Sequence, residues 1–313
     1  MTAPAASYKK VFYDLRPAKQ VERRMLIDTL HLLAEGGFRI RDYQYTGFGS
    51  VSFVDFILLH RLVGLQRLLS VEHDLTIRKR IEFNRPFDQV DVRMEQIGTV
   101  IPDLDRDLKH ILWLDYDFLL RKSALDDTAL AATRLSPGSI LVVTLDVEPP
   151  NNEGPETWYD YFKEEAGDRL PFELGPGDFG LSKLPQIVGQ IVFNAIRSGM
   201  AGRTNLAFFP LFNFVYKDGH QMVTVGGMFG TTTEKAMLDG CDFRSAHFLR
   251  TSVTDTPYEI RVPRLTRRER IYMDHHMPCV AGWTPPDFEL SAQDVDDYLS
   301  VYRYYPGYAE LLL

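Results

Sequence analysis

Cysteine is scarce in this chain of 313 residues, where Cys241 and Cys279 are the two present. They cannot form the disulfide framework of a small secreted domain, and they lack the CxxC spacing of thiolate metal sites. We therefore expect a reducing, cytoplasmic setting and no resident metal ion.

The chain also lacks an excess of positive charge. It contains 35 Lys and Arg against 43 Asp and Glu, which gives a formal net charge of -8. A molecule with this balance is not built as a whole to bind a phosphate polymer. Basic residues nevertheless gather in two places: Lys9, Lys10, Arg16, Lys19, Arg23 and Arg24, and later Arg261, Arg264, Arg267, Arg268 and Arg270. Each group is either a solvated helix face or a local anion-binding face, which leaves nucleic-acid or nucleotide contact through Arg261, Arg264, Arg267 and Arg268 as a possible partner interaction.

Long hydrophobic runs are missing as well, and the first seven residues are small and polar. No run approaches the roughly 20 apolar residues that a membrane span needs, so we expect a soluble protein without membrane contact. A hydrophobic content of 45% over this length is enough for one large core with appendages.

The most informative stretch of the sequence starts at Tyr43, where tyrosines alternate before a glycine pair. The pattern predicts a strand, a turn at Gly47 and Gly49, and a helix over residues 51–63. A second strand over residues 68–71 then ends on Glu72. This order predicts a nucleoside-cofactor site, in which bare backbone approaches the ligand at a helix N-terminus and the carboxylate binds a ribose.

Further strands and helices alternate along the chain. The expected elements are helices at 18–36, 75–84, 124–134 and 182–198 and strands at 90–94, 111–114 and 139–145. Such alternation predicts a doubly wound, mainly parallel α/β sheet. Two apolar runs, 205–216 and 221–229, flank an Asp-Gly turn, and they predict a terminal antiparallel hairpin.

The expected organisation has three parts. Residues 1–37 form an N-terminal arm and helix, residues 38–230 form a Rossmann-like cofactor-binding domain, and residues 231–313 form a C-terminal extension. A stretch rich in proline, glycine and acids, at about 147–180, is expected to be a lid on the substrate side.

The glycine turn, Glu72, Glu95 after the third strand, Asp115 after the fourth and the closing hairpin resemble the class I S-adenosylmethionine-dependent methyltransferases. The resemblance covers roughly residues 20–230 and is at the level of a superfamily. It implies S-adenosylmethionine as cofactor and methyl transfer to an oxygen or nitrogen acceptor, whether a small molecule, a nucleotide or RNA. The site residues that it implies are Tyr45, Gly47, Phe48, Gly49, Ser50, Glu72 and Glu95 (or its neighbour) for the cofactor, and Asp115 and Asp117 for catalysis.

The sequence departs from that family at two positions of the glycine turn. Tyr45 stands where an acid is usual, and Val51 replaces a third glycine. Either Asp115, Asp117 or Asp42 substitutes for the missing acid, or an aromatic ring at 45 or 48 faces the sulfonium by a cation–π contact. A dinucleotide cofactor fits less well, because the third glycine of GxGxxG is a serine here and dehydrogenases do not ordinarily close their sheet with such a hairpin.

Asp115 and Asp117 lie two residues apart at a strand end, so they share an orientation if the strand continues that far. They orient the acceptor, or one holds the cofactor while the other acts as base; the alternative is that one simply caps the next helix. Because the acid at 45 is missing, a second hypothesis is a Rossmann-like module that binds an adenosine ligand without methyl transfer. Arg16, Lys19, Glu22 and Arg23 form either surface pairs or a charged edge beside the site.

Overall fold

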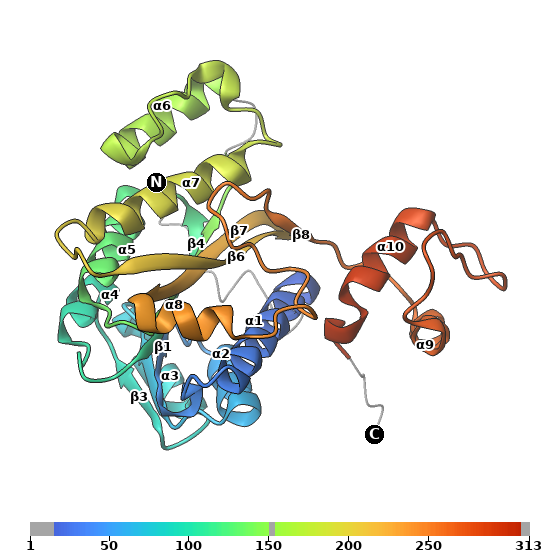
Figure 1. The fold of residues 1–313 in the computed structure, drawn as a ribbon, viewed down its shortest axis with the longest axis horizontal. Coiled ribbons are helices and arrows are strands. Elements are labelled where there is room, and N and C mark those ends of the chain that lie inside the picture. The colour runs from blue at the N-terminus through green and yellow to red at the C-terminus, as the bar shows by residue number, and fades with distance from the viewer. Residues whose placement is uncertain (1–15, 150–153, 308–313) are drawn as a thin grey trace.

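The computed structural model describes residues 16–149 and 154–307, and its centre is a sheet of strands in the order β3-β2-β1-β4-β5-β7-β6-β8 (Figure 1). The strands are β1 (Gln44–Gly47), β2 (Arg67–Val71), β3 (Val90–Arg93), β4 (His110–Leu119), β5 (Ile140–Asp146), β6 (Ala207–Asp218), β7 (His220–Gly230) and β8 (Tyr258–Ile260). Strands β1 to β5 are parallel, and β7 runs antiparallel to both β5 and β6. The fold class predicted from the sequence is therefore confirmed.

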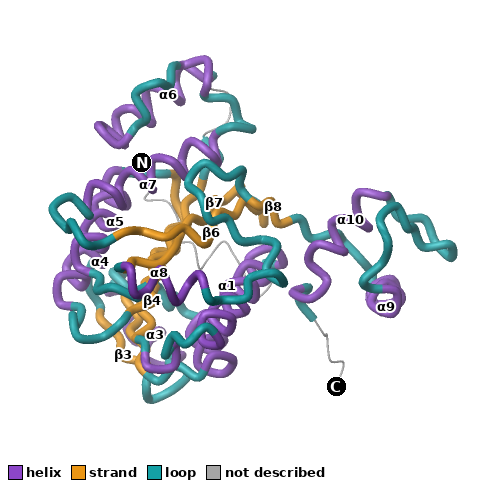
Figure 2. The backbone as a smooth tube through the Cα atoms, in the orientation of Figure 1, coloured by secondary structure: helices purple, strands orange, loops and turns teal. Residues whose placement is uncertain are grey.

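The helices lie around this sheet, except for the last two, which extend away from it (Figure 2). They are α1 (Pro17–Glu35), α2 (Val54–Leu58), α3 (Arg78–Asn84), α4 (Ile97–Val100), α5 (Lys122–Arg134), α6 (Pro155–Ala166), α7 (Leu184–Gly199), α8 (Thr232–Asp239), α9 (Arg267–His276) and α10 (Ala292–Val301). Apolar side chains of α1, α2 and α3 pack in one core cluster, and those of α4, α5, α6 and α7 pack in another. Strands such as β5 carry apolar side chains on both faces, and they therefore need an apolar layer on each side of the sheet. No helix in the described ranges is long and apolar enough to cross a membrane.

The direction of strand connections changes between β1 and β4, which are neighbours in the sheet although they are far apart in sequence. In open α/β sheets, ligands bind outside the carboxyl ends of the strands at such a point. The register places Gly47 beside Ser70 of β2 on one side and beside Trp113 of β4 on the other. The glycine turn therefore leaves the sheet next to the ends of both neighbours.

The helix after the glycine turn begins later than the sequence pattern indicated. Regular helix starts at Val54 rather than Val51, because Ser50 and Phe53 adopt positive φ angles of 48° and 50°. The backbone N–H of Phe53 donates to the carbonyl of Gly49 at 2.8 Å, which closes the turn. After α2 the chain continues in a π-helical turn, Leu59–Val63, and Gly64 ends it with a φ of 84°.

The expected hairpin is formed by β6 and β7, and Gly219 has a φ of 104° in the tight turn between them. Asp218, at the end of β6, also accepts hydrogen bonds from the backbone N–H groups of Ala18 (3.1 Å) and Lys19 (2.8 Å). The hairpin thus fixes the first turn of α1 against the sheet.

Two parts of the chain differ from the sequence-based expectation. The insertion after β5 contains helix α6, and Tyr161 on it donates a hydrogen bond to the carbonyl of Leu120 at 2.9 Å. The extended piece at 258–260 joins the sheet as edge strand β8, parallel to β6. Beyond it, α9 and α10 extend away from the sheet around a small core of their own (Figure 1). The chain then returns to α1, where Tyr304 donates to Asp28 at 2.7 Å.

Candidate functional site

The glycine turn is bare backbone that packs tightly on its surroundings. A Cβ atom at Gly47 would lie 2.5 Å from the hydroxyl of Tyr45, and one at Gly49 would lie 2.7 Å from the ring of Phe53 and closer still to Ser70 Oγ. Side chains at these two positions would displace the turn. Ser70 Oγ itself is buried and has no hydrogen-bond partner among the described residues.

Tyr45 lies beneath this turn with 1% of its surface exposed. Its ring packs edge-on against Phe56 at a centroid distance of 4.8 Å. Burial, with the nearby carboxylates of Asp55 and Asp115, raises the pKa of the Tyr45 phenol well above its ordinary value. The ring of Phe48 instead packs 5.3 Å from Tyr116, on the other side of the sheet.

Glu72 follows β2, and local hydrogen bonds fix its carboxylate. Its Oε1 accepts from the backbone N–H groups of His73 (2.8 Å) and Asp74 (3.0 Å), and its own N–H donates to the carbonyl of Arg93 at 3.0 Å. No hydrogen bond or ion pair to a residue in the described ranges engages Oε2. This second oxygen is free to accept from a ligand hydroxyl.

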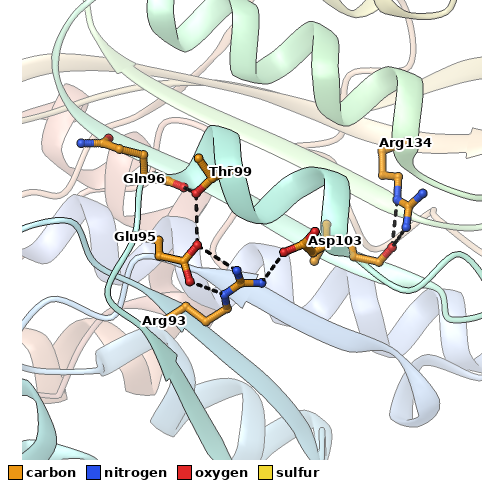
Figure 3. Close-up of polar contacts among 7 residues, drawn as sticks. Arg93, Glu95, Gln96, Thr99, Asp103 and Arg134 are labelled. Carbon is orange, nitrogen blue, oxygen red and sulfur yellow. Dashed lines mark hydrogen bonds and ion pairs between the residues drawn. The ribbon is translucent and has the colours of Figure 1, made fainter.

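Glu95 folds back onto the strand that precedes it (Figure 3). Arg93 donates to both of its carboxylate oxygens, at 2.9 and 2.8 Å, and also to Asp103 at 2.9 Å. The side chain of Gln96 points away from this cluster. The Glu95 carboxylate is thus occupied by Arg93, whereas the side chain of Gln96 is available to contact a ligand beyond the end of β3.

Asp115 lies on β4 in register with Thr144 of β5, two residues beyond Trp113. Its Oδ1 accepts a hydrogen bond from Lys19 Nζ at 2.7 Å, and its side chain is 18% exposed. Burial alone would raise the pKa of this carboxyl, but the charge and hydrogen bond of Lys19, with the charges of Arg16 and Arg23, bring it below the ordinary value. Asp115 is therefore ionised at neutral pH.

Asp117 differs in its surroundings. Strand β4 continues to Leu119, so Asp117 is part of the strand, and it is exposed. Between the two acids, Tyr116 is buried on the opposite face and donates to Asp127 at 2.8 Å. The two aspartates thus offer one partly buried, paired carboxylate and one exposed carboxylate at the same strand end.

Three charged residues of α1, Lys19, Glu22 and Arg23, are buried rather than exposed in surface pairs. Lys19 is 0% exposed and contacts Glu22 at 2.8 Å as well as Asp115. Arg23 donates to Asp55, in the first turn of α2, at 2.5 Å. Helix α1 therefore contacts β4 and the start of α2 through buried ion pairs. The sequence signal for this arrangement was the occurrence of charges at positions 19, 22 and 23 among apolar residues. The sequence alone does not say which face of the helix packs against the sheet, and so it does not show that these charges are buried.

These groups fit S-adenosylmethionine. Gly47 and Gly49 let the turn pack directly on Tyr45, Phe53 and Ser70, because a Cβ at either position would clash with those side chains, and the buried Ser70 hydroxyl has no hydrogen-bond partner among the described residues. Glu72 has an oxygen to offer ribose hydroxyls, and Asp115 has a second oxygen without a contact to any described residue. A mainly parallel sheet that closes with an antiparallel hairpin is the fold of the class I methyltransferases, and the chain has this fold.

Comparison with known proteins identifies the family within this class. A family model described as "Putative O-methyltransferase" matches residues 11–313, and the chain belongs to that family. It is accordingly an S-adenosylmethionine-dependent methyltransferase, as the sequence predicted. No curated protein matches the chain.

Solved structures with similar folds include several methyltransferases. Trm1 from Pyrococcus horikoshii, in complex with S-adenosyl-L-methionine, shares 15% identity over 79% of this chain and 66% of its own, with a TM-score of 0.46. An O-methyltransferase from Bacillus cereus, in complex with SAH, shares 14% identity over 71% of this chain and 86% of its own, with a TM-score of 0.38. At these identities the likeness concerns the fold.

Proposed function

We propose that this methyltransferase binds the amino-acid end of S-adenosylmethionine beside Asp115 and methylates an oxygen acceptor at the carboxyl end of β4. The observation that carries the proposal is an ionised carboxylate, with one oxygen uncommitted, on the strand next to the glycine turn. A cationic ammonium group pairs best with a carboxylate that stays charged. Asp115 would then supply the negative charge that Tyr45 does not. The family description favours oxygen over nitrogen as the acceptor atom.

The remaining cofactor contacts follow from the same geometry. Glu72 would accept hydrogen bonds from the ribose hydroxyls, and Gln96 rather than Glu95 would face the adenine. The backbone of residues 47–50 would pass along the methionine part, with Ser50 and Phe48 at the edge of the turn. Tyr45 would support the turn from below, because its buried ring offers no face to a ligand.

The chemistry at the acceptor requires in-line geometry and the loss of one proton. When bound, S-adenosylmethionine supplies a methyl group on a sulfonium whose leaving group is a neutral thioether. With its amino-acid end held by Asp115, the cofactor would supply the methyl group to the acceptor oxygen and would leave as the thioether, which keeps the electron pair of the former carbon–sulfur bond. We assign the acceptor proton to Asp117, which is accessible, because the lowered pKa of Asp115 makes it a weak base.

The test compares S-adenosylhomocysteine with methylthioadenosine, which lacks the amino-acid end, by calorimetry. Asp115→Asn should weaken S-adenosylhomocysteine binding about tenfold or more, as loss of a charge-assisted hydrogen bond does, and leave methylthioadenosine binding unchanged. Asp117→Asn makes the same chemical change two residues away and should leave both affinities unchanged. Equal losses for both ligands in Asp115→Asn would contradict the assignment of Asp115.

A nucleic-acid acceptor is a second candidate, based on exposed arginines before and in α9. Arg261 is paired with Glu259, whereas Arg264, Arg267 and Arg268 are exposed and form no ion pair with any residue in the described ranges. Neutralising these three should weaken binding to an RNA oligonucleotide and flatten its salt dependence. If the unmodified protein shows no salt-dependent RNA binding, this candidate is excluded.

We further propose that residues 147–180 act as a lid over the acceptor and that residues 38–230 are the cofactor-binding domain, with residues 1–37 and 231–313 as additions to it.

Cys241 and Cys279 are both free thiols, which supports a reducing, cytoplasmic setting.

A further inference from the structure

Lys19 is a buried lysine at the centre of several contacts. Its Nζ lies 2.7 Å from Asp115 Oδ1 and 2.8 Å from Glu22 Oε2. The same ammonium lies 4.4 Å from the centroid of the Trp113 ring and 5.6 Å from that of Tyr216. Two carboxylates and two aromatic faces therefore surround one cation that has no exposed surface.

The position of Lys19 is fixed at both ends. Asp218 accepts the backbone N–H groups of Ala18 and Lys19, so the helix turn that carries Lys19 cannot slide along the sheet. Trp113, which packs against the ammonium, donates its own indole N–H to Thr144 at 3.0 Å. The side chain therefore reaches Asp115 from a rigid frame, as a group that must orient another side chain requires.

We propose that Lys19 is a positioning residue of the active site, which holds the Asp115 carboxylate in one orientation with its second oxygen toward the ligand. The inference rests on the cofactor role proposed for Asp115. The new element is the role of helix α1, which determines the charge and the orientation of the Asp115 carboxylate. Sites of this kind are usually formed by the ends of strands. An ion pair that only stabilised the fold would have no such effect on ligand binding.

Loss of the lysine charge predicts a pH effect. The largest influence on Asp115 is burial, which raises its pKa, and Lys19 is the strongest group that lowers it. Without Lys19 the pKa of Asp115 rises, and the carboxylate needed for the ammonium is lost as the solution becomes more acidic. The charged or titratable groups around Asp115 and Lys19 come from several elements. They are Arg16, which precedes α1, Glu22 and Arg23 of α1, Tyr45 of β1, Asp55 of α2, and Tyr216 and Asp218 of β6.

The experiment measures S-adenosylhomocysteine affinity between about pH 5 and pH 8. Lys19→Met keeps the length of the side chain and removes its charge. Its affinity should fall as pH decreases, by up to about tenfold per pH unit below the new pKa, whereas wild-type affinity should change much less. Lys235→Met, on exposed α8, is the matched control and should behave as wild type.

The double variant Lys19→Met, Asp115→Asn separates Asp115 from its neighbours. If Asp115 is the titrating group, the added pH dependence disappears in the double variant. If the dependence persists there, Glu22 or another group is responsible and the proposal is wrong. A pH profile for folded Lys19→Met that matches wild type also overturns it, even where Asp115→Asn has confirmed the role of Asp115. If Asp115→Asn has no selective effect, the proposed function fails instead.

Lys19→Arg provides a second variant should Lys19→Met fail to fold. A guanidinium keeps the charge but is larger and planar, so it cannot occupy the same point between Asp115 and Glu22. We expect severalfold weaker S-adenosylhomocysteine binding with methylthioadenosine binding retained. Wild-type affinity for S-adenosylhomocysteine in folded Lys19→Arg would refute the positioning role.

Discussion

The ion pair between Arg23 and Asp55 gives the sharpest prediction for stability. The two side chains are 4% and 8% exposed, and the Nε–Oδ1 distance is 2.5 Å. Replacement of Arg23 by methionine retains most of the aliphatic packing but leaves the Asp55 carboxylate buried without its partner. Breaking a buried pair in this way costs about 3–5 kcal/mol of unfolding free energy. Arg24→Met, in the same helix but exposed, should cost at most about 0.5 kcal/mol.

Urea unfolding followed by circular dichroism measures this difference, with both variants compared at one pH. Adding Asp55→Asn to Arg23→Met should restore part of the lost stability, because the double variant no longer buries an unpaired charge. The reasoning is refuted if Arg23→Met is no less stable than Arg24→Met. It is also refuted if the double variant is as unstable as the sum of its single changes.

Three further predictions concern other parts of the molecule. Gly49→Ala should destabilise the fold by about 1–3 kcal/mol through overpacking and abolish S-adenosylhomocysteine binding, and Ser70→Gly should partly restore stability because it removes the clashing hydroxyl. Burial raises the pKa of Glu22, and the charge of Lys19 offsets this rise only in part. The wild-type protein therefore loses stability as the pH rises from the pKa of Glu22 in the unfolded chain through its pKa in the folded protein. The unfolding free energy of Glu22→Gln relative to wild type should therefore increase between about pH 5 and pH 8. Phe172→Ser should not lower the melting temperature, because this side chain is 99% exposed.

Elements with a local signature were predictable from the sequence. The hairpin follows from Asp218 and Gly219 between two apolar runs, since a positive φ at the glycine makes the tight turn. The parallel strands follow from alternation with helices, and β5, which is buried at every position and begins with four apolar residues, fits a strand covered on both faces. The acids at 72 and 115 could be placed at the same sheet edge because parallel strands end together.

Features that depend on distant partners were not predictable in the same way. Helix α6 lies in a stretch rich in proline, glycine and acids, and its contacts with the start of α5 are tertiary. The late start of α2 depends on the positive φ of Phe53, and phenylalanine rarely adopts a positive φ, so its presence does not predict one. The edge strand β8 forms because β6 has an edge available for pairing. The three residues of β8 do not themselves reveal that partner.

The buried charges of α1 bear on one departure of the glycine turn from the family pattern, the tyrosine at position 45. Tyr45 fills the space beneath the turn with its ring, so a carboxylate at that position is replaced by apolar packing and a phenol that stays neutral. The negative charge instead lies on Asp115, one strand away, where burial alone would favour its neutral form. Lys19 reverses that preference, and Asp218 and Trp113 hold Lys19 in place. If Asp115 binds the cofactor as we propose, the cation on α1 keeps that carboxylate charged in the absence of an acid on β1, which gives a reason for burying a lysine, a costly residue to bury, in the first turn of this helix.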